Sequence, residues 1–201
     1  MPDYRYELCE ALATTRFQGP RFVAEEHPTA EQHLRTALAI SQELVREHPQ
    51  IPEYAAAQIH IRHKLAHVLR ETNRPQAADA CLCSALDLQT ALARQFPAVG
   101  SLRVWQAVVQ ESLANLLCES GELNEASSLL EASVATLQEC LAREHKSDDV
   151  RLLVRNYQVL ADVLTRLGEP AQAEVARRQA QDPSLEARPP ARPNPSGTAE
   201  E

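Results

Sequence analysis

The sequence predicts an all-α fold in which about four helical hairpins stack into a solenoid, and three observations support this prediction. The pairs Leu65-Ala66, Leu113-Ala114 and Leu160-Ala161 recur at a spacing of 47 to 48 residues. Single alanines recur at the same spacing, each after a turn, at Ala78, Ala126 and Ala173. With only 5 glycines and 4% aromatic residues, the composition favours helices over strands. A fixed period of this size indicates repeats that bury their apolar faces against their neighbours.

The first unit is irregular. Apolar residues at helical spacing predict one helix around Tyr4, Leu8 and Leu12, and a partner helix through Ala30, Leu34, Ala37 and Leu44. The connection from Arg16 to Pro28 is longer than the tight turns of the later units. We expect it to fold over the open end of the stack, with an exposed contact patch formed by Phe17 and Phe22 as the alternative.

The second unit is more regular. Its first helix is predicted over Pro52–Thr72 and ends at Asn73, a residue that tolerates the left-handed conformation. Its second helix opens at Pro75, where the missing N–H costs nothing, and ends before Pro97.

The third and fourth units repeat this pattern. Helices are predicted over Leu102–Glu119 and from Ala126 through Leu141, with Gly121 between them. The last pair covers Val150–Leu167 and Pro170 to about Gln181. We therefore predict a repeat domain over residues 1–181. A proline-rich tail over residues 182–201 is expected to be disordered because it has too little apolar surface to form a core.

Composition also bears on partners and compartment. A net charge of −8 without a basic run argues against nucleic acid, and no apolar stretch approaches the ~18 residues that a membrane span needs. The N-terminus lacks the basic and apolar regions of a signal peptide. Five cysteines without a CxxC pair predict buried or half-buried thiols in a reducing cytoplasm.

The predicted hairpins resemble tetratricopeptide repeats in the small residues at their helix contacts. That family places small side chains at the eighth, twentieth and twenty-seventh positions of its unit, because the two helices approach closely there. The matching residues are Ala66, Ala78 and Ala85, then Ala114, Ala126 and Ser133, then Ala161, Ala173 and Ala180. The resemblance covers about residues 30–181 and implies a tetratricopeptide-like right-handed α-solenoid that acts as a non-catalytic scaffold.

The chain departs from that family in two respects. Its period exceeds the family's 34 residues by about two helix turns per helix. Leu69, Leu82 and Leu117 stand where the family has aromatic residues. Long repeats with phrases such as EHPQIPEYAA are similar to segments attached to bacterial Ser/Thr kinases and sigma-factor-like signalling proteins. The alternative function is thus a stand-alone or truncated regulatory segment of such a system, although no kinase motif is present.

The resemblance also implies a binding groove. In tetratricopeptide proteins the first helix of each hairpin lines the concave surface, where a protein or peptide binds. The corresponding candidates are His60, His63, His67, Arg70, Glu111, Asn115, Glu119, Arg155, Asp162 and Arg166. We expect the three histidines and Arg70 to form a basic strip, with histidine pKa values near ~6.5, that binds a carboxylate-bearing peptide more strongly below neutral pH. The oligomeric state stays open.

Catalysis is not predicted, and neither is a cofactor. His60, His63 and His67 share one helix face, which makes a metal-binding enzyme a remote alternative, but there is no HExxH and no cysteine at ligand spacing. Trp105 lies on the apolar face of its helix with Leu102 and Val109, which favours a packed core residue over an exposed anchor. No GxSxG or phosphate-binding loop occurs.

Overall fold

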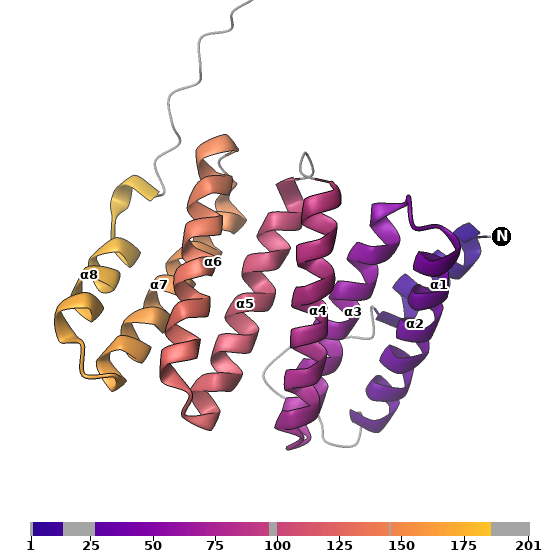
Figure 1. Ribbon diagram of the computed structural model, residues 1–201, viewed down its shortest axis with the longest axis horizontal. Helices are drawn as coiled ribbons and strands as arrows, with labels where there is room; N and C mark the ends of the chain where they lie inside the picture. The colour runs from indigo at the N-terminus through magenta and orange to yellow at the C-terminus, as the bar shows by residue number, and fades with distance from the viewer. Residues whose placement is uncertain (1, 14–26, 97–99, 145, 186–201) are drawn as a thin grey trace, which may run out of the picture.

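The computed structural model describes residues 2–13, 27–96, 100–144 and 146–185, and within them the chain forms only helices and turns. The helices stack in chain order from α1 at one end to α8 at the other (Figure 1). Their bounds are α1 (Pro2–Ala13), α2 (His27–Glu47), α3 (Pro52–Glu71), α4 (Pro75–Gln95), α5 (Gly100–Ser120), α6 (Leu123–Arg143), α7 (Ser147–Arg166) and α8 (Pro170–Ala180), followed by the 3₁₀ turn Pro183–Leu185. The predicted all-α architecture of about four hairpins is confirmed.

Three of the hairpins turn in the same way. Asn73, Gly121 and Gly168 have positive φ angles of 57°, 90° and 81° and follow the first helix of their hairpins. After each of them, a backbone N–H bonds back to a carbonyl in the last helical turn at 2.9 Å: Arg74 to Leu69, Glu122 to Leu117 and Glu169 to Leu164. This Schellman-type ending satisfies carbonyl groups that a helix end would otherwise leave unpaired. The sequence-predicted turns therefore lie where the period places them.

Small side chains let the two helices of a hairpin approach closely. Of the nine residues matched to the family's small positions, eight are at most 3% exposed, and Ala180, in the short last helix, is half-buried. Apolar residues from Cys9 in α1 to Ala176 in α8 form one continuous core along the stack. Burial of this surface between hairpins stabilises helices that would be marginal alone.

Polar side chains join neighbouring hairpins inside this core. The Ser133 hydroxyl on α6 donates to the Ala107 carbonyl on α5 at 3.0 Å and accepts from the Asn156 amide on α7 at the same distance. Both side chains are fully buried. Ser133 therefore fixes α5, α6 and α7 relative to one another, because its unmade hydrogen bonds would be costly in an apolar core.

The irregular first unit is joined to the second by charged groups. Glu31 on α2 is 9% exposed and receives two hydrogen bonds, of 2.9 and 2.5 Å, from the Arg74 guanidinium in the α3–α4 turn. These bonds hold the pKa of the Glu31 carboxyl below its usual value. Lys64 of α3 donates to the Ala13 carbonyl at the end of α1 at 2.7 Å. The stack therefore includes α1 and α2, although their connection does not follow the repeat.

Two sequence predictions, on the connection after α1 and on the C-terminal tail, fall wholly or largely outside the described residues. The connection after α1, with Phe17 and Phe22, lies outside the described residues. Residues 186–201 of the predicted tail lie outside them too. Within residues 182–185, Leu185 is half-buried against the core. None of the described helices is both long and apolar enough to cross a lipid bilayer.

Candidate functional site

The first helices of the hairpins lie together on one side of the stack. α3 contacts α5, and α5 contacts α7, in addition to the contacts within and between consecutive helices. No pair of even-numbered helices makes comparable contact in the part of the chain that is described. Closer spacing of the odd-numbered helices makes their side the inner one, which is where the resemblance puts a groove.

An aromatic cluster of His60, His63 and Trp105 lies on this inner face, where α3 meets α5. The His60 ring on α3 packs against the Trp105 ring on α5 with centroids 4.5 Å apart, and the His63 ring meets Trp105 edge-on at 6.4 Å. His63 Nε2 is 2.7 Å from the Ser112 hydroxyl, another α5 group. Trp105 is half-buried, so it is neither the packed core residue that the sequence favours nor a fully exposed anchor.

The prediction of a basic histidine strip is wrong for two of the three histidines. Burial, with a smaller effect of nearby Lys64, lowers the pKa of His60 to about 4. Burial, with smaller effects of His60, His67 and Lys64, lowers the pKa of His63 to about 4 as well. Both imidazoles are therefore neutral at physiological pH. His63 is also half-buried, so its ring is only partly accessible to a ligand. The spacing of the histidines is visible in the sequence, but their desolvation depends on Trp105 and on how α5 packs against α3.

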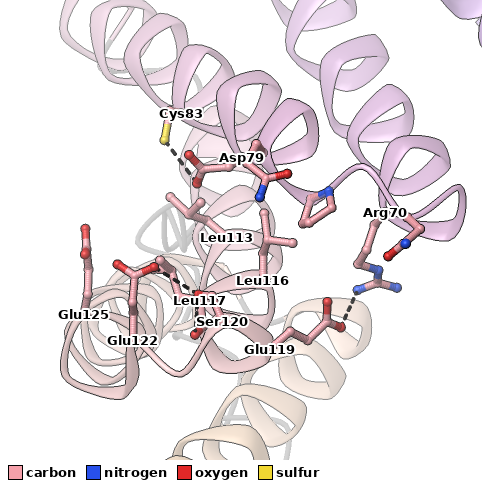
Figure 2. A pocket seen from close by; sticks show the side chains of 13 residues that line it. Arg70, Asp79, Cys83, Leu113, Leu116, Leu117, Glu119, Ser120, Glu122 and Glu125 are labelled. Carbon is pink, nitrogen blue, oxygen red and sulfur yellow. Dashed lines mark hydrogen bonds and ion pairs between the residues drawn. The ribbon is translucent and has the colours of Figure 1, made fainter.

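Arg70 lies at the C-terminal end of α3, and its charge is shared with carboxylates. Its guanidinium is 3.4 Å from Glu71. It is also 3.9 Å from Glu119 on α5 (Figure 2). The Arg70 side chain is 35% exposed and that of Glu119 58%, so the pair is of the solvated kind that contributes little stability. His67 is exposed one turn before Arg70, and Asn115 is half-buried on α5.

The α5–α7 half of the inner face repeats this cross-hairpin pairing. The Arg155 guanidinium on α7 lies 2.6 Å from Glu111 on α5, whose side chain is only 6% exposed. One turn beyond exposed Asp162, Arg166 donates to the Cys118 carbonyl at 3.0 Å. A buried carboxylate such as Glu111 needs this partner because an isolated charge would be costly there.

These contacts define a surface that we call the inner strip. It comprises the ten residues predicted from the sequence together with Trp105 and Ser112. Sequence reasoning missed these two as site residues. Trp105 lies one helix turn before the positions that the family uses, and only the stacking of hairpins brings it onto His60.

The histidines do not come together as a metal centre. Among the residues that the structure describes, no three His, Cys, Asp or Glu side chains are placed to hold a metal ion. His60 and His63 instead contact Trp105 and Ser112. The remote alternative of a metal-binding enzyme therefore has no geometry to support it here.

Comparison with solved structures gives the fold. RapI in its apo form aligns over 90% of this chain with a TM-score of 0.62 and 13% identity, and this chain spans 41% of the length of RapI. The designed helical repeat protein DHR64 aligns over 92% of this chain and 96% of its own, with a TM-score of 0.54 and 15% identity. BtubC from P. vanneervenii aligns over 100% of this chain and 90% of its own, with a TM-score of 0.54 and 16% identity.

This chain has the fold of a tetratricopeptide-like right-handed α-solenoid. Because all three identities are low, the likeness concerns architecture alone. No protein-family model and no curated protein matches the sequence.

Proposed function

We propose that this protein is a non-catalytic helical-repeat scaffold that binds a protein or peptide segment along the inner strip. The observation that carries this proposal is the pairing of side chains from α3, α5 and α7 across hairpins, through His63–Ser112, Arg70–Glu119 and Arg155–Glu111. This pairing gives a continuous polar and aromatic surface that spans three repeats. A solenoid of this kind presents an extended surface suited to an extended ligand.

The chemistry of the strip favours a partner with an apolar or aromatic side chain at one end and carboxylates at the other. Neutral His60 beside half-buried Trp105 offers a flat surface on which a ring or aliphatic chain can pack. Arg155 and Arg166 expose their guanidinium groups on α7 and can donate to a carboxylate or backbone carbonyl. The basic end of the strip is therefore on α7 rather than on the histidines of α3.

The proposed test begins with a peptide selected from a displayed library against the immobilised protein. Its affinity is then measured for a double variant, Arg70→Ala with Arg166→Ala, because both guanidinium groups lie on the strip and neither is paired with a buried carboxylate. We prefer this pair to alanine at His63 and Arg70, since His63 is half-buried and hydrogen-bonded. Binding should weaken by about 1–3 kcal/mol, with unchanged helix content by circular dichroism.

A matched control removes the same charge from the outer helices. Arg94 on α4 and Arg143 on α6 are exposed residues of the even-numbered helices and do not belong to the strip. Arg94→Ala with Arg143→Ala should leave the affinity within about 0.5 kcal/mol of the wild-type value. Equal losses in both double variants would mean that the peptide responds to overall charge and not to the strip.

The alternative function, a regulatory repeat segment of a bacterial kinase or sigma-factor system, uses the same surface with a particular partner. It stays a prediction, as does the cytoplasmic compartment expected from five cysteines, all of which are unpaired in the structure.

A further inference from the structure

A cleft opens between the second and third hairpins, at the end of the stack where α3 turns into α4 and α5 into α6. We call it the turn-end cleft. Its volume is about 550 Å³, within the range of sites that hold a few side chains. Ser127 on α6, 48 residues after Asp79 and equivalent to it in the repeat, is 7% exposed, whereas Asp79 is half-buried and lines open space. The packing around Asp79 is therefore looser than the packing around Ser127 at the equivalent position of the next repeat.

The cleft has an apolar wall. Leu113, Leu116 and Leu117 of α5 line it between the ends of the two hairpins (Figure 2). All three are between 5% and 8% exposed, so they are packed in the core and present only a small face to the cleft. Such a wall can bury one aliphatic side chain of a partner, which is a favourable contact in water.

The remaining lining is strongly acidic. Four carboxylates border the cleft, Asp79, Glu119, Glu122 and Glu125, against one guanidinium, that of Arg70. Arg70 is already shared between Glu71 and Glu119. Within the described residues, no lysine or arginine forms an ion pair with Asp79, Glu122 or Glu125. Asp79 accepts a hydrogen bond from the Cys83 thiol, and Glu122 accepts one from the Ser120 hydroxyl.

The spacing of these carboxylates indicates the kind of cation that fits. Asp79 is on α4 and Glu119 on α5, whereas Glu122 immediately precedes α6 and Glu125 lies in its first turn (Figure 2). No three acidic side chains in the described parts of the chain converge closely enough to hold a metal ion. Charge spread round an apolar wall is complementary to long basic side chains that flank an aliphatic residue.

We propose that the turn-end cleft is a second docking site, which takes a polypeptide segment carrying lysine or arginine beside an aliphatic residue. The aliphatic side chain packs on Leu113 and Leu116, and the basic groups pair with Asp79, Glu122 and Glu125. This site is separate from the aromatic end of the inner strip, because Leu116 lies about 16 Å along α5 from Trp105. The two surfaces share only Arg70 and Glu119.

The experiment uses three fluorescein-labelled octapeptides with glycine pairs at both ends. Their centres are Lys-Leu-Leu-Lys, Glu-Leu-Leu-Glu and Lys-Ser-Ser-Lys, and fluorescence anisotropy measures their binding to the full chain. The Lys-Leu-Leu-Lys peptide should bind. Its affinity should fall as salt is added, because its contacts are partly exposed charges. The other two should bind about tenfold or more weakly, since each lacks one of the two complementary features.

Two variants locate the binding. The first variant is a triple that keeps side-chain size, Asp79→Asn with Glu122→Gln and Glu125→Gln. It should weaken binding of the Lys-Leu-Leu-Lys peptide about tenfold or more. A control triple, Glu7→Gln with Glu131→Gln and Glu169→Gln, removes the same charge from exposed positions outside the cleft and should keep wild-type affinity. Cys83→Trp fills the cleft from an exposed position, so it should block binding without unfolding the protein.

Cys83 supplies a readout that does not depend on the charge variants. It lines the cleft and is the one exposed thiol among the five cysteines. The Lys-Leu-Leu-Lys peptide should slow its alkylation by N-ethylmaleimide, followed by mass spectrometry. The proposal is overturned if no peptide binds, if the cleft and control triples weaken binding equally, or if Cys83 reacts at the same rate with peptide present. Those outcomes leave the inner strip untouched, because its independent readout is Trp105, which does not line the cleft.

Discussion

At the scale of single residues, His63 shows how packing changes a side chain whose position the sequence predicts. The spacing of His60, His63 and His67 places them on one helix face, and the structure has them there. Their chemistry depends on neighbours that are distant in sequence, because Trp105 and Ser112 of α5 cover and bind His63. An imidazole that protonates near its usual pKa and binds a ligand was expected, whereas an imidazole that stays neutral down to about pH 4 and joins two hairpins is found.

A pH-dependent stability follows from the lowered pKa of His63. Its folded pKa of about 4 lies below the ~6.5 of an unfolded chain, so between these values the unfolded state binds the extra proton. The contribution of the neutral imidazole to the free energy of unfolding is fully present above about pH 6.5 and is lost as the pH falls toward 4. The His63→Gln variant can still hydrogen-bond Ser112 but does not titrate. When the pH falls from about 7 to about 5, its free energy of unfolding should decrease by about 1–2 kcal/mol less than that of the wild type.

Urea unfolding followed by circular dichroism at the two pH values checks this prediction. His60 still titrates in the variant, so part of the pH dependence should remain. Parallel stability curves for wild type and variant would show that His63 is solvated in the folded protein.

At the scale of helices, the contact between the two helices of a hairpin was the most predictable feature. Small residues at fixed spacing mark it, and a turn residue with positive φ precedes each second helix from α4 onward. Both signals are local in the sequence. The polar contacts between hairpins were not predicted, because Ser133 bonds Ala107 and Asn156 only after three helices have packed.

Overpacking tests this placement of the hairpin contact. Ala126 on α6 is fully buried, so Ala126→Leu should cost roughly 1–3 kcal/mol of unfolding free energy by forcing α5 and α6 apart. Ala132→Leu, at an exposed position of the same helix, is the matched control and should change stability by less than about 0.5 kcal/mol. Equal stability of the two variants would show that Ala126 does not lie at a close helix contact.

At the scale of the whole molecule, the solenoid could be predicted because three of its four units repeat at a spacing of 47 to 48 residues, although the first unit is irregular. The identity of the inner helices came from the resemblance, and the cross-hairpin pairing of Arg155 with Glu111 agrees with it. The turn-end cleft could not be predicted, since its lining comes from α3, α4, α5 and α6 and its volume depends on how two hairpins meet. Likewise, no sequence pattern marks Trp105 as a surface residue.

The central claim, that a partner binds along the inner strip, can be tested through Trp105. It is the only tryptophan of the chain and packs on His60 within the strip, so its emission reports on that surface alone. Titration with the selected peptide should shift the Trp105 emission and reduce its quenching by acrylamide, with the same dissociation constant as an independent anisotropy titration. Saturable binding by anisotropy with unchanged Trp105 emission and quenching would contradict the claim and place the partner elsewhere on the solenoid.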